Sequence, residues 1–173
     1  MSPPPHVPLS PRAQLVVCDP DLCIGCQLCE FACAVVKDDS ANILRSRIRV
    51  IRQEPILMIS IACRGCEDPA CVKVCPRDGA LAVNPNNGLI DVDNDICDGC
   101  GWCIDACPFG VIFLDPETKR VIICDLCAGR DAGPACVEMC SKDALEVSTP
   151  AVVAGKVRQS ALRTLMDALD EPA

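Results

Sequence analysis

The residues best able to do chemistry in this chain are its cysteines. There are seventeen in 173 residues, and sixteen of them fall into four groups of four. Each group begins with C-x2-C and ends with C-x3-C, so that only the insertion between the two pairs varies. The grouped residues are Cys23, Cys26, Cys29 and Cys33; Cys63, Cys66, Cys71 and Cys75; Cys97, Cys100, Cys103 and Cys107; Cys124, Cys127, Cys136 and Cys140. Cys18 lies outside the groups.

The spacing within each group points to iron–sulfur chemistry. A C-x2-C turn lets two sulfurs converge on one metal centre, whereas cysteines four apart lie on one helix face, displaced by about one turn. The first and third groups match the ferredoxin spacing C-x2-C-x2-C-x3-C, in which three cysteines bind one [4Fe–4S] cluster and the fourth binds its neighbour. We therefore expect four [4Fe–4S] clusters, with all sixteen grouped cysteines as metal ligands.

Zinc and disulfides are the alternatives. Zinc also binds C-x2-C pairs in closed sets of four, but three ligands within seven residues suit a cluster better. A disulfide scaffold is expected in small secreted proteins, usually with an even number of cysteines. The proline-rich segment at the start of the sequence resembles neither a secretory signal nor a twin-arginine leader. We therefore expect a cytoplasmic location and reduced thiols.

Composition excludes several other classes of function. The net charge of −8 argues against a nucleic-acid partner, which requires a basic face. No apolar run approaches the roughly 18 residues of a membrane span, so direct membrane insertion is not expected. The sequence has a single histidine, His6, and no phosphate-binding glycine loop. We expect electron transfer without a catalytic site of its own.

Two longer motifs carry a resemblance to a known family. The stretches CRGCEDPACVKVCPRDGAL and CPFGVIFLDPETKRVIICDLC resemble the second group and the third-to-fourth hairpin of four-cluster ferredoxin-type electron-transfer subunits. Those subunits serve molybdenum and tungsten pterin oxidoreductases, and relatives serve hydrogenases, formate dehydrogenases and carbon monoxide dehydrogenases. The resemblance covers roughly residues 15–148.

The resemblance implies a nested pairing, of group one with group four and group two with group three. The implied cluster ligands are Cys23, Cys26, Cys29 and Cys140; Cys124, Cys127, Cys136 and Cys33; Cys63, Cys66, Cys71 and Cys107; Cys97, Cys100, Cys103 and Cys75. The spacings alone do not fix this partition, because a sequential pairing of one with two and three with four would satisfy them equally well.

The segments between and around the cysteine groups predict the elements that position these ligands, and together they indicate an α+β fold. It would consist of two ferredoxin-like halves, with short β-hairpins and short helices around the four clusters. Hairpins are expected over 46–63, 80–93 and 110–123, turning at Gln53–Pro55, Asn86–Gly88 and Asp115–Lys119. Helices are expected at Leu28–Val36, Ala70–Val74, Trp102–Ala106 and Pro134–Met139.

Three segments are expected along the chain: a proline-rich arm over 1–14, the four-cluster domain over 15–148, and a C-terminal helix over 149–173. Thr149 is a candidate helix cap and Pro150 suits the first helical position. Apolar residues then recur every four positions from Val153 to Leu169, which is typical of an amphipathic helix. Packing on its own domain and docking onto another subunit both remain open.

The function expected from these features is that of an electron-transfer subunit. It would conduct single electrons between a large catalytic oxidoreductase subunit and a second electron donor or acceptor. A tungsten or molybdenum pterin enzyme, such as an aldehyde oxidoreductase, is the favoured catalytic partner. Hydrogenase, formate dehydrogenase and carbon monoxide dehydrogenase partners remain alternatives, as do a free polyferredoxin and self-assembly into longer arrays.

Four further residues have expected roles. Cys18 is expected to be a small buried apolar residue. Arg64, Lys73 and Arg77 lie close to the second group, where positive charge would raise the potential of a cluster. The alternative is that these side chains are solvated or paired with a partner.

Overall fold

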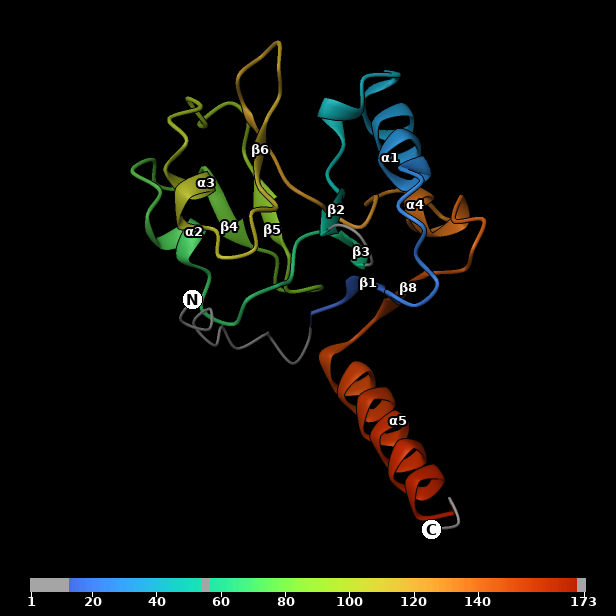
Figure 1. Cartoon of the computed structure of the whole chain (residues 1–173). Helices are drawn as coiled ribbons and strands as arrows, with labels where there is room; N and C mark the ends of the chain where they lie inside the picture. The colour runs from blue at the N-terminus through green and yellow to red at the C-terminus, as the bar shows by residue number, and fades with distance from the viewer. Residues whose placement is uncertain (1–12, 54–56, 171–173) are drawn as a thin grey trace.

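The computed structural model describes residues 13–53 and 57–170. Within them the chain forms a two-lobed body of short helices and hairpins, from which one long helix projects (Figure 1). The elements of the first lobe are β1 (Leu15–Cys18), α1 (Leu28–Asp38), η1 (Ile43–Arg45), β2 (Arg49–Gln53), β3 (Leu57–Ile61), α4 (Ala135–Glu138) and β8 (Leu145–Ser148). Those of the second lobe are α2 (Ala70–Lys73), β4 (Leu81–Val83), β5 (Ile90–Val92), α3 (Trp102–Ala106), β6 (Phe113–Leu114) and β7 (Val121–Ile122).

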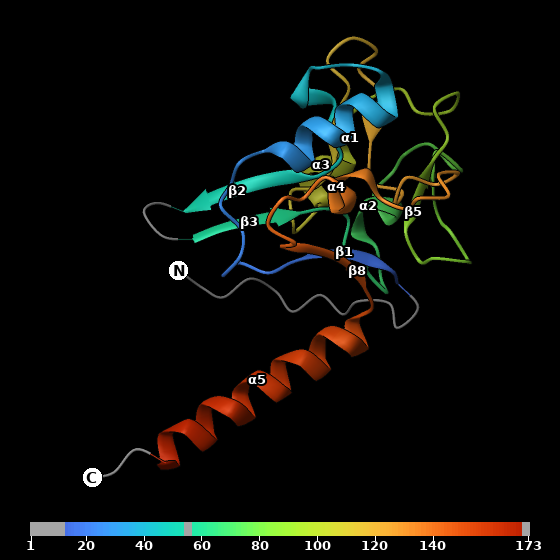
Figure 2. The same cartoon turned by 90° about the vertical axis from the view of Figure 1, so that its right-hand side faces the viewer.

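All four sheets are antiparallel pairs. Three are the hairpins β2–β3, β4–β5 and β6–β7, which the sequence predicts. The fourth joins β1 to β8, from opposite ends of the described chain, with Leu15 opposite Ser148 and Cys18 opposite Leu145. This pair lies beneath α1 and α4 in Figure 2 and closes the first lobe. This pair was not among the elements predicted from the sequence.

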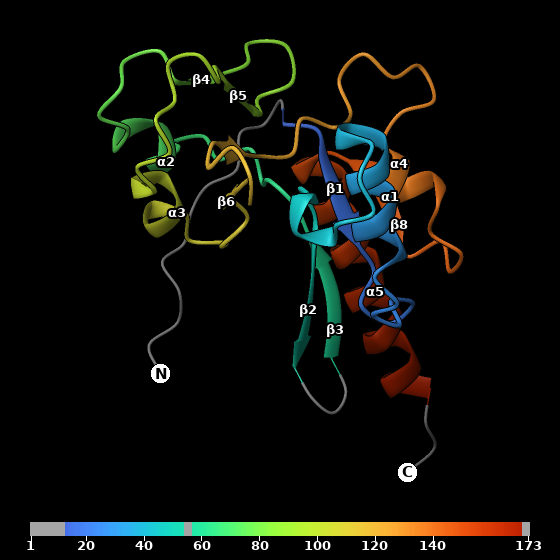
Figure 3. The ribbon, with the colours of Figure 1, turned by 90° about the horizontal axis from the view of Figure 1, so that it is seen from above.

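The turns of the hairpins follow from local side chains. In β4–β5, the Asn84 side-chain oxygen accepts the backbone N–H of Asn86 at 2.9 Å, and Gly88 has a φ of 70°. The predicted turn at Asn86–Gly88 is therefore confirmed. In β6–β7, Oδ1 of Asp115 accepts the N–H groups of Glu117 and Thr118, at 3.0 and 2.7 Å. The first predicted turn, at Gln53–Pro55, lies mostly outside the described residues. The β2–β3 strands that flank it extend well away from the body (Figure 3).

The helices lie close to their predicted positions. Helix α1 runs two residues beyond the predicted Val36, to Asp38, and Asp39 ends it with a left-handed φ of 46°. Helices α2 and α4 are one turn long, whereas α3 has the predicted bounds. Each of these helices carries ligand candidates at or beside its ends, and α1 packs against α4 while α2 packs against α3.

The core of the body is small and rich in sulfur. Eight of the eighteen buried residues in its main cluster are cysteines. The largest fully buried side chains are aliphatic, and they include Leu15, Ile48, Leu89 and Val111. Because so much of the interior is thiol, the packing of this body depends on what those sulfurs hold.

Helix α5 (Pro150–Asp170) begins at the predicted Pro150, where the carbonyl of Thr149 accepts the N–H of Val153 at 3.0 Å. At 21 residues it is about 31 Å long. Its apolar side chains Val157, Leu162 and Leu165 are all exposed.

Residues 1–12 of the predicted arm lie outside the described residues, whereas Ala13 is buried and the N–H of Gln14 donates to the carbonyl of Asn87.

Candidate metal centres

The grouped cysteines gather at four places, which we name sites I to IV in the order in which they lie through the body. Site I is a pocket lined by Cys23, Cys26, Cys29 and Cys140. Three of these come from the loop before α1 and its first turn, and Cys140 follows α4. Gly25 belongs to the same loop and has a φ of 65°, and a Cβ at that position would lie 2.6 Å from the sulfur of Met58. Glycine is therefore needed for the turn that aims these sulfurs inward.

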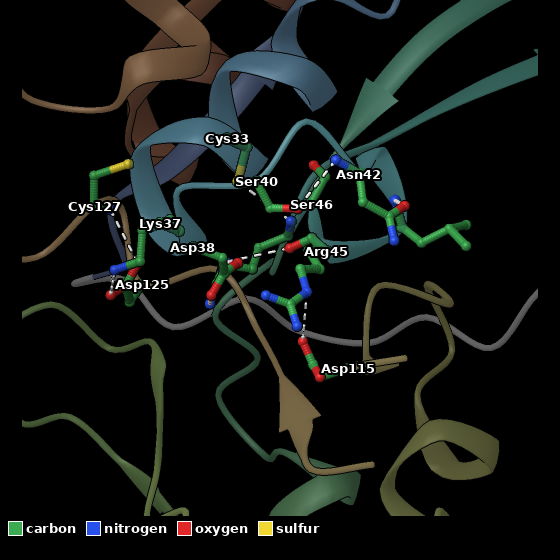
Figure 4. Close-up of polar contacts among 12 residues, drawn as sticks. Cys33, Lys37, Asp38, Ser40, Asn42, Arg45, Ser46, Asp115, Asp125 and Cys127 are labelled. Atoms are coloured by element: carbon green, nitrogen blue, oxygen red, sulfur yellow. Dashed lines mark hydrogen bonds and ion pairs between the residues drawn. The ribbon is translucent and has the colours of Figure 1, made fainter. Parts of the chain in front are cut away.

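Site II comprises Cys33, Cys124, Cys127 and Cys136, whose side chains are all buried. The charge of Cys33 acts on both Cys124 and Cys136, and Cys127 also acts on Cys136, which shows that the four lie near one another. The backbone N–H of Arg47 points at Cys33 Sγ across 3.3 Å, and Oδ1 of Asp125 accepts the N–H of Cys127 at 3.1 Å. Figure 4 shows Cys33 and Cys127 within this network of polar contacts.

Sites III and IV occupy the second lobe. Site III is a pocket lined by Cys63, Cys66, Cys71 and Cys107, with Ile90, Val111, Ile112 and Ile123 among its apolar walls. Site IV is a pocket lined by Cys75, Cys97, Cys100 and Cys103, with Ala80, Leu81 and Val121 among its walls. In both, the last cysteine of one group joins the first three of the other, because helices α2 and α3 lie side by side.

The four sites form a row. The charge of Cys29 in site I acts on Cys136 of site II, and the charge of Cys63 in site III acts on Cys124 of site II. Sites III and IV share helix α2, which has Cys71 within it and Cys75 just beyond its end. Cys26 in site I and Cys100 in site IV are exposed, whereas all four cysteines of site II are buried. The row therefore reaches the surface at its two ends.

Burial raises the pKa of several thiols in these sites and so favours their protonated form until a metal binds them. It raises the pKa of Cys71 and of Cys136 to about 12, and that of Cys103 to about 11. Neighbouring cysteines raise these pKa values further because their charges repel. Metal ions displace such protons on binding, so these donor sets have the chemistry that thiolate-ligated iron requires. Among the described residues, no three His, Cys, Asp or Glu side chains meet the geometry for one bound metal ion. The quartets of sites I, III and IV line pockets instead.

The quartets have the same membership as the nested pairing. A sequential pairing would require Cys140 to join Cys97, Cys100 and Cys103, but Cys140 lies in site I, in the other lobe. The geometry therefore supports the nested assignment, while the identity of the bound groups stays a prediction.

Several charged residues join the two lobes near sites II and III. Nζ of Lys37 on α1 lies 2.6 Å from Asp125, and Nε of Arg45 on η1 lies 3.2 Å from Oδ2 of Asp115 after β6 (Figure 4). The guanidinium of Arg49 stacks over the ring of Phe113, with 4.2 Å between its carbon and the ring centroid. The contacts of Arg45 and Arg49 tie the η1–β2 segment of the first lobe to the β6–β7 hairpin of the second, whereas the Lys37–Asp125 pair joins α1 to the loop between Cys124 and Cys127, within site II.

The other residues singled out in the sequence have varied surroundings. Cys18 is buried as expected, and burial raises its pKa to about 11. Arg64 lies close enough to Cys63 and Cys66 for their charges to act on it. Lys73 and Arg77 form ion pairs at the surface, with Asp68 and Asp98.

Sequence reasoning missed Ser60, a buried serine that lines site I. Its position three residues before Cys63, on an otherwise aliphatic strand, was the only signal available.

Among the described residues, no helix is both long and apolar enough to cross a membrane.

Comparison with known proteins places these sites in a family. The family described as a 4Fe-4S dicluster domain matches residues 55–149. YsaA of Escherichia coli K12, named as an electron transport protein, is 40% identical over 142 residues, which are 77% of this chain and 88% of YsaA. The thiosulfate reductase electron transfer subunit PhsB of Salmonella typhi is 34% identical over 139 residues, which are 74% of this chain and 71% of PhsB.

The iron–sulfur subunit of formate dehydrogenase-O from Escherichia coli K12 is 35% identical over 155 residues, which are 76% of this chain. The chain spans 51% of that subunit, and it spans only 24% of the longer Escherichia coli protein AegA, which is 35% identical. A solved structure of the benzoyl coenzyme A reductase complex BamBC with 1,5-dienoyl-CoA aligns over 79% of this chain and 75% of its own, with 26% identity and a TM-score of 0.49. On its match to the family and to these relatives, the chain belongs to the 4Fe-4S dicluster domain family of ferredoxin-type iron–sulfur proteins.

Proposed function

We propose that this protein is the electron-transfer subunit of an oxidoreductase complex and carries four [4Fe–4S] clusters. The observation that carries the proposal is the row of four cysteine quartets, buried in the middle and exposed at both ends. When bound, each cluster would supply reversible one-electron oxidation and reduction. Complete thiolate ligation leaves no site for a substrate, so the chain conducts electrons and does not catalyse a reaction itself.

The residues of the chain have three tasks in this function. The sixteen grouped cysteines hold the clusters in the nested assignment described above. Apolar walls, such as Ile90, Ile112 and Ile123 at site III, exclude water from the interior. The ion pair Arg45–Asp115 fixes sites II and III relative to one another, because it joins the lobes that hold them. The ion pair Lys37–Asp125 joins α1, which carries Cys33, to the loop that carries Cys124 and Cys127, and so supports site II itself.

The favoured catalytic partner is a tungsten or molybdenum pterin enzyme of the aldehyde oxidoreductase type, in the cytoplasm, with a second redox protein at the other end of the row. The sequence resemblance supports this choice. The relatives named for thiosulfate reductase and formate dehydrogenase favour a partner of one of those classes as the second candidate. Helix α5 supports a subunit over a free shuttle, because its exposed apolar side chains are suited to docking on another chain.

Anaerobic purification of the protein from its own cells tests the proposal. We expect about sixteen iron atoms per chain, visible absorption that dithionite bleaches, and comigration with a large chain that contains tungsten or molybdenum. Comigration with a large chain that lacks both metals would refute the tungsten or molybdenum partner and favour a catalytic subunit of another class. A small brown protein that migrates alone would refute the subunit role, and a colourless protein containing zinc would refute electron transfer.

A further inference from the structure

Site I contains a hydroxyl group that has no counterpart among the lining residues of the other pockets. Ser60, on β3, is 4% exposed and lines the pocket beside the four cysteines. Its Oγ lies 3.5 Å from Sγ of Cys29 and 3.9 Å from Sγ of Cys23, which are distances suited to hydrogen bonds with sulfur. Both cysteines are more than thirty residues away in sequence, so the contact depends on the tertiary packing of β3 against the α1 loop.

The pockets of sites III and IV differ at this point. Their lining residues, in the described part of the chain, include no serine or threonine. The walls there are mainly apolar, with Arg64 as the charged residue at site III and the Arg77–Asp98 ion pair at site IV. The buried hydroxyl therefore distinguishes site I from both sites of the second lobe.

The direction of these hydrogen bonds follows from the chemistry of the sulfurs. In free thiols either atom can donate the proton. Thiolates bound to iron have no proton and can only accept, so the hydroxyl of Ser60 must then be the donor. Its described partners are the sulfurs of Cys29 and Cys23 and the thiol of Cys18, which is not one of the grouped cysteines. A thiol that keeps its proton can donate to the hydroxyl oxygen, which leaves the hydroxyl proton for the ligand sulfurs. Because Ser60 is buried, leaving that proton without an acceptor would be costly.

We propose that Ser60 is a positioning residue that acts through Cys29 and Cys23 to raise the reduction potential of the site I cluster. The inference rests on the proposed function. Reduction adds one negative charge, which the ligand sulfurs share, and a donated O–H stabilises the more negative state more strongly. Hydrogen bonds to cluster sulfurs are an established means of tuning such potentials. Because site I is one of the two ends of the row, Ser60 sets the driving force for the electron step between sites I and II.

The test compares Ser60→Ala and Ser60→Gly with Ser60→Thr, which keeps the hydroxyl, in the full chain purified anaerobically. Ser148→Ala is the matched control, because Ser148 is a buried strand serine with no sulfur contact among the bonds described. Redox titrations followed by electron paramagnetic resonance give the four midpoint potentials, and iron content is measured in parallel. In Ser60→Ala and Ser60→Gly, we expect one centre to become about tenfold harder to reduce, which is 59 mV for one electron. The other three potentials, and all four in Ser60→Thr and Ser148→Ala, should stay unchanged.

Three results would overturn the inference. One is full iron content in Ser60→Ala with all four potentials unchanged. Another is an equal shift in Ser148→Ala, which would show a general effect of serine removal. The third is loss of the same cluster from both Ser60→Ala and Ser60→Gly, because the hydroxyl would then serve assembly and not the potential. A wild-type protein with far fewer than about sixteen iron atoms would refute the proposed function instead, before any potentials are compared.

Discussion

The ion pair between Arg45 and Asp115 links the two lobes and offers a quantitative test of how sites II and III are held. Nε of Arg45 lies 3.2 Å from Oδ2 of Asp115, and the two side chains are only 16% and 8% exposed. That Nε has no well-aligned hydrogen-bond acceptor, so its interaction with the carboxylate is mainly one of charge. Arg45 also pairs with Glu117 at 2.6 Å, but the Glu117 side chain is 76% exposed.

The substitution Asp115→Asn removes the charge and keeps the shape. The remaining oxygen can still accept the N–H groups of Glu117 and Thr118, so the β6–β7 turn should persist. Breaking a buried pair by removing one partner costs about 3 to 5 kcal/mol. The exposed Glu117 still compensates Arg45 by about 1 kcal/mol at most. We therefore expect Asp115→Asn to destabilise the loaded protein by about 2 to 4 kcal/mol.

The assay is the rate at which visible absorption is lost in denaturant under anaerobic conditions, because cluster loss makes unfolding irreversible. A loss of about 2 kcal/mol corresponds to roughly thirtyfold faster bleaching, if the contact is absent from the transition state for unfolding. Lys73→Met is the control, since the Lys73–Asp68 pair has side chains that are 64% and 62% exposed. It should change the rate by no more than about fivefold. Equal rates for the two variants would refute the reasoning.

The dependence of this effect on pH follows from the carboxyl group. Burial alone would raise the pKa of Asp115, but the N–H groups of Thr118 and Glu117, together with Arg45, outweigh it and hold that pKa below its ordinary value. Such a group stabilises the fold at all pH values above its unfolded pKa of about 3.9, and the stabilisation is lost only as pH falls through the lower folded value. The penalty of Asp115→Asn should therefore be constant between about pH 6 and about pH 9, and a penalty that varies there would contradict the assignment.

Three further predictions concern the sites themselves. Cys140→Ala should alter the same centre whose potential responds to Ser60→Ala, because both residues line site I; if a different centre changes, the nested pairing is wrong. Gly99→Ala should release iron from site IV, since Gly99 has a φ of 73° and a Cβ there would collide with the carbonyl oxygen of Lys119. Gly129→Ala, with a φ of 86° and nothing within 4 Å of the added Cβ, should cost only about 1 kcal/mol and retain its iron. Removal of iron with a chelator should abolish cooperative unfolding measured by circular dichroism, because the core is so rich in cysteine, and an apo-protein that unfolds as sharply as the loaded one would contradict this.

The sequence predicted the parts of this structure that have local signals. Helix α3 has the predicted bounds, and the predicted hairpins over 80–93 and 110–123 form, although β6 and β7 are only two residues long each. The grouping of cysteines followed from spacing alone, because each group lies within one loop and one short helix. These features depend on neighbours a few residues apart, which periodicity and turn chemistry describe well.

The features that the sequence did not reveal depend on distant contacts. Strand β1 is four residues long and pairs with β8 from the other end of the domain, so no turn between them marks the pair. The role of Ser60 depends on its contacts with sulfurs in α1 and the loop before it. The role of Arg45 likewise depends on its ion pair with Asp115, which lies in a distant hairpin. A single sequence contains no local record of such tertiary contacts, and the choice between nested and sequential pairing was open for the same reason.

Two partly buried arginines connect stability to function. Although the chain is acidic, Arg49 lies close enough to Cys33, and Arg64 to Cys63 and Cys66, for the charges of those cysteines to act on them. Burial lowers the pKa of both guanidinium groups, whereas Glu30 and then Cys33 raise that of Arg49, and Cys63 and Cys66 raise that of Arg64. Arg64 is therefore costly when the thiols are neutral and favourable when they are thiolates, while Arg49 is already compensated in part by Glu30. If the sites hold clusters as proposed, the positive charge that compensates the thiolates would also favour the reduced form, so these arginines would stabilise the fold and raise the potentials through one interaction.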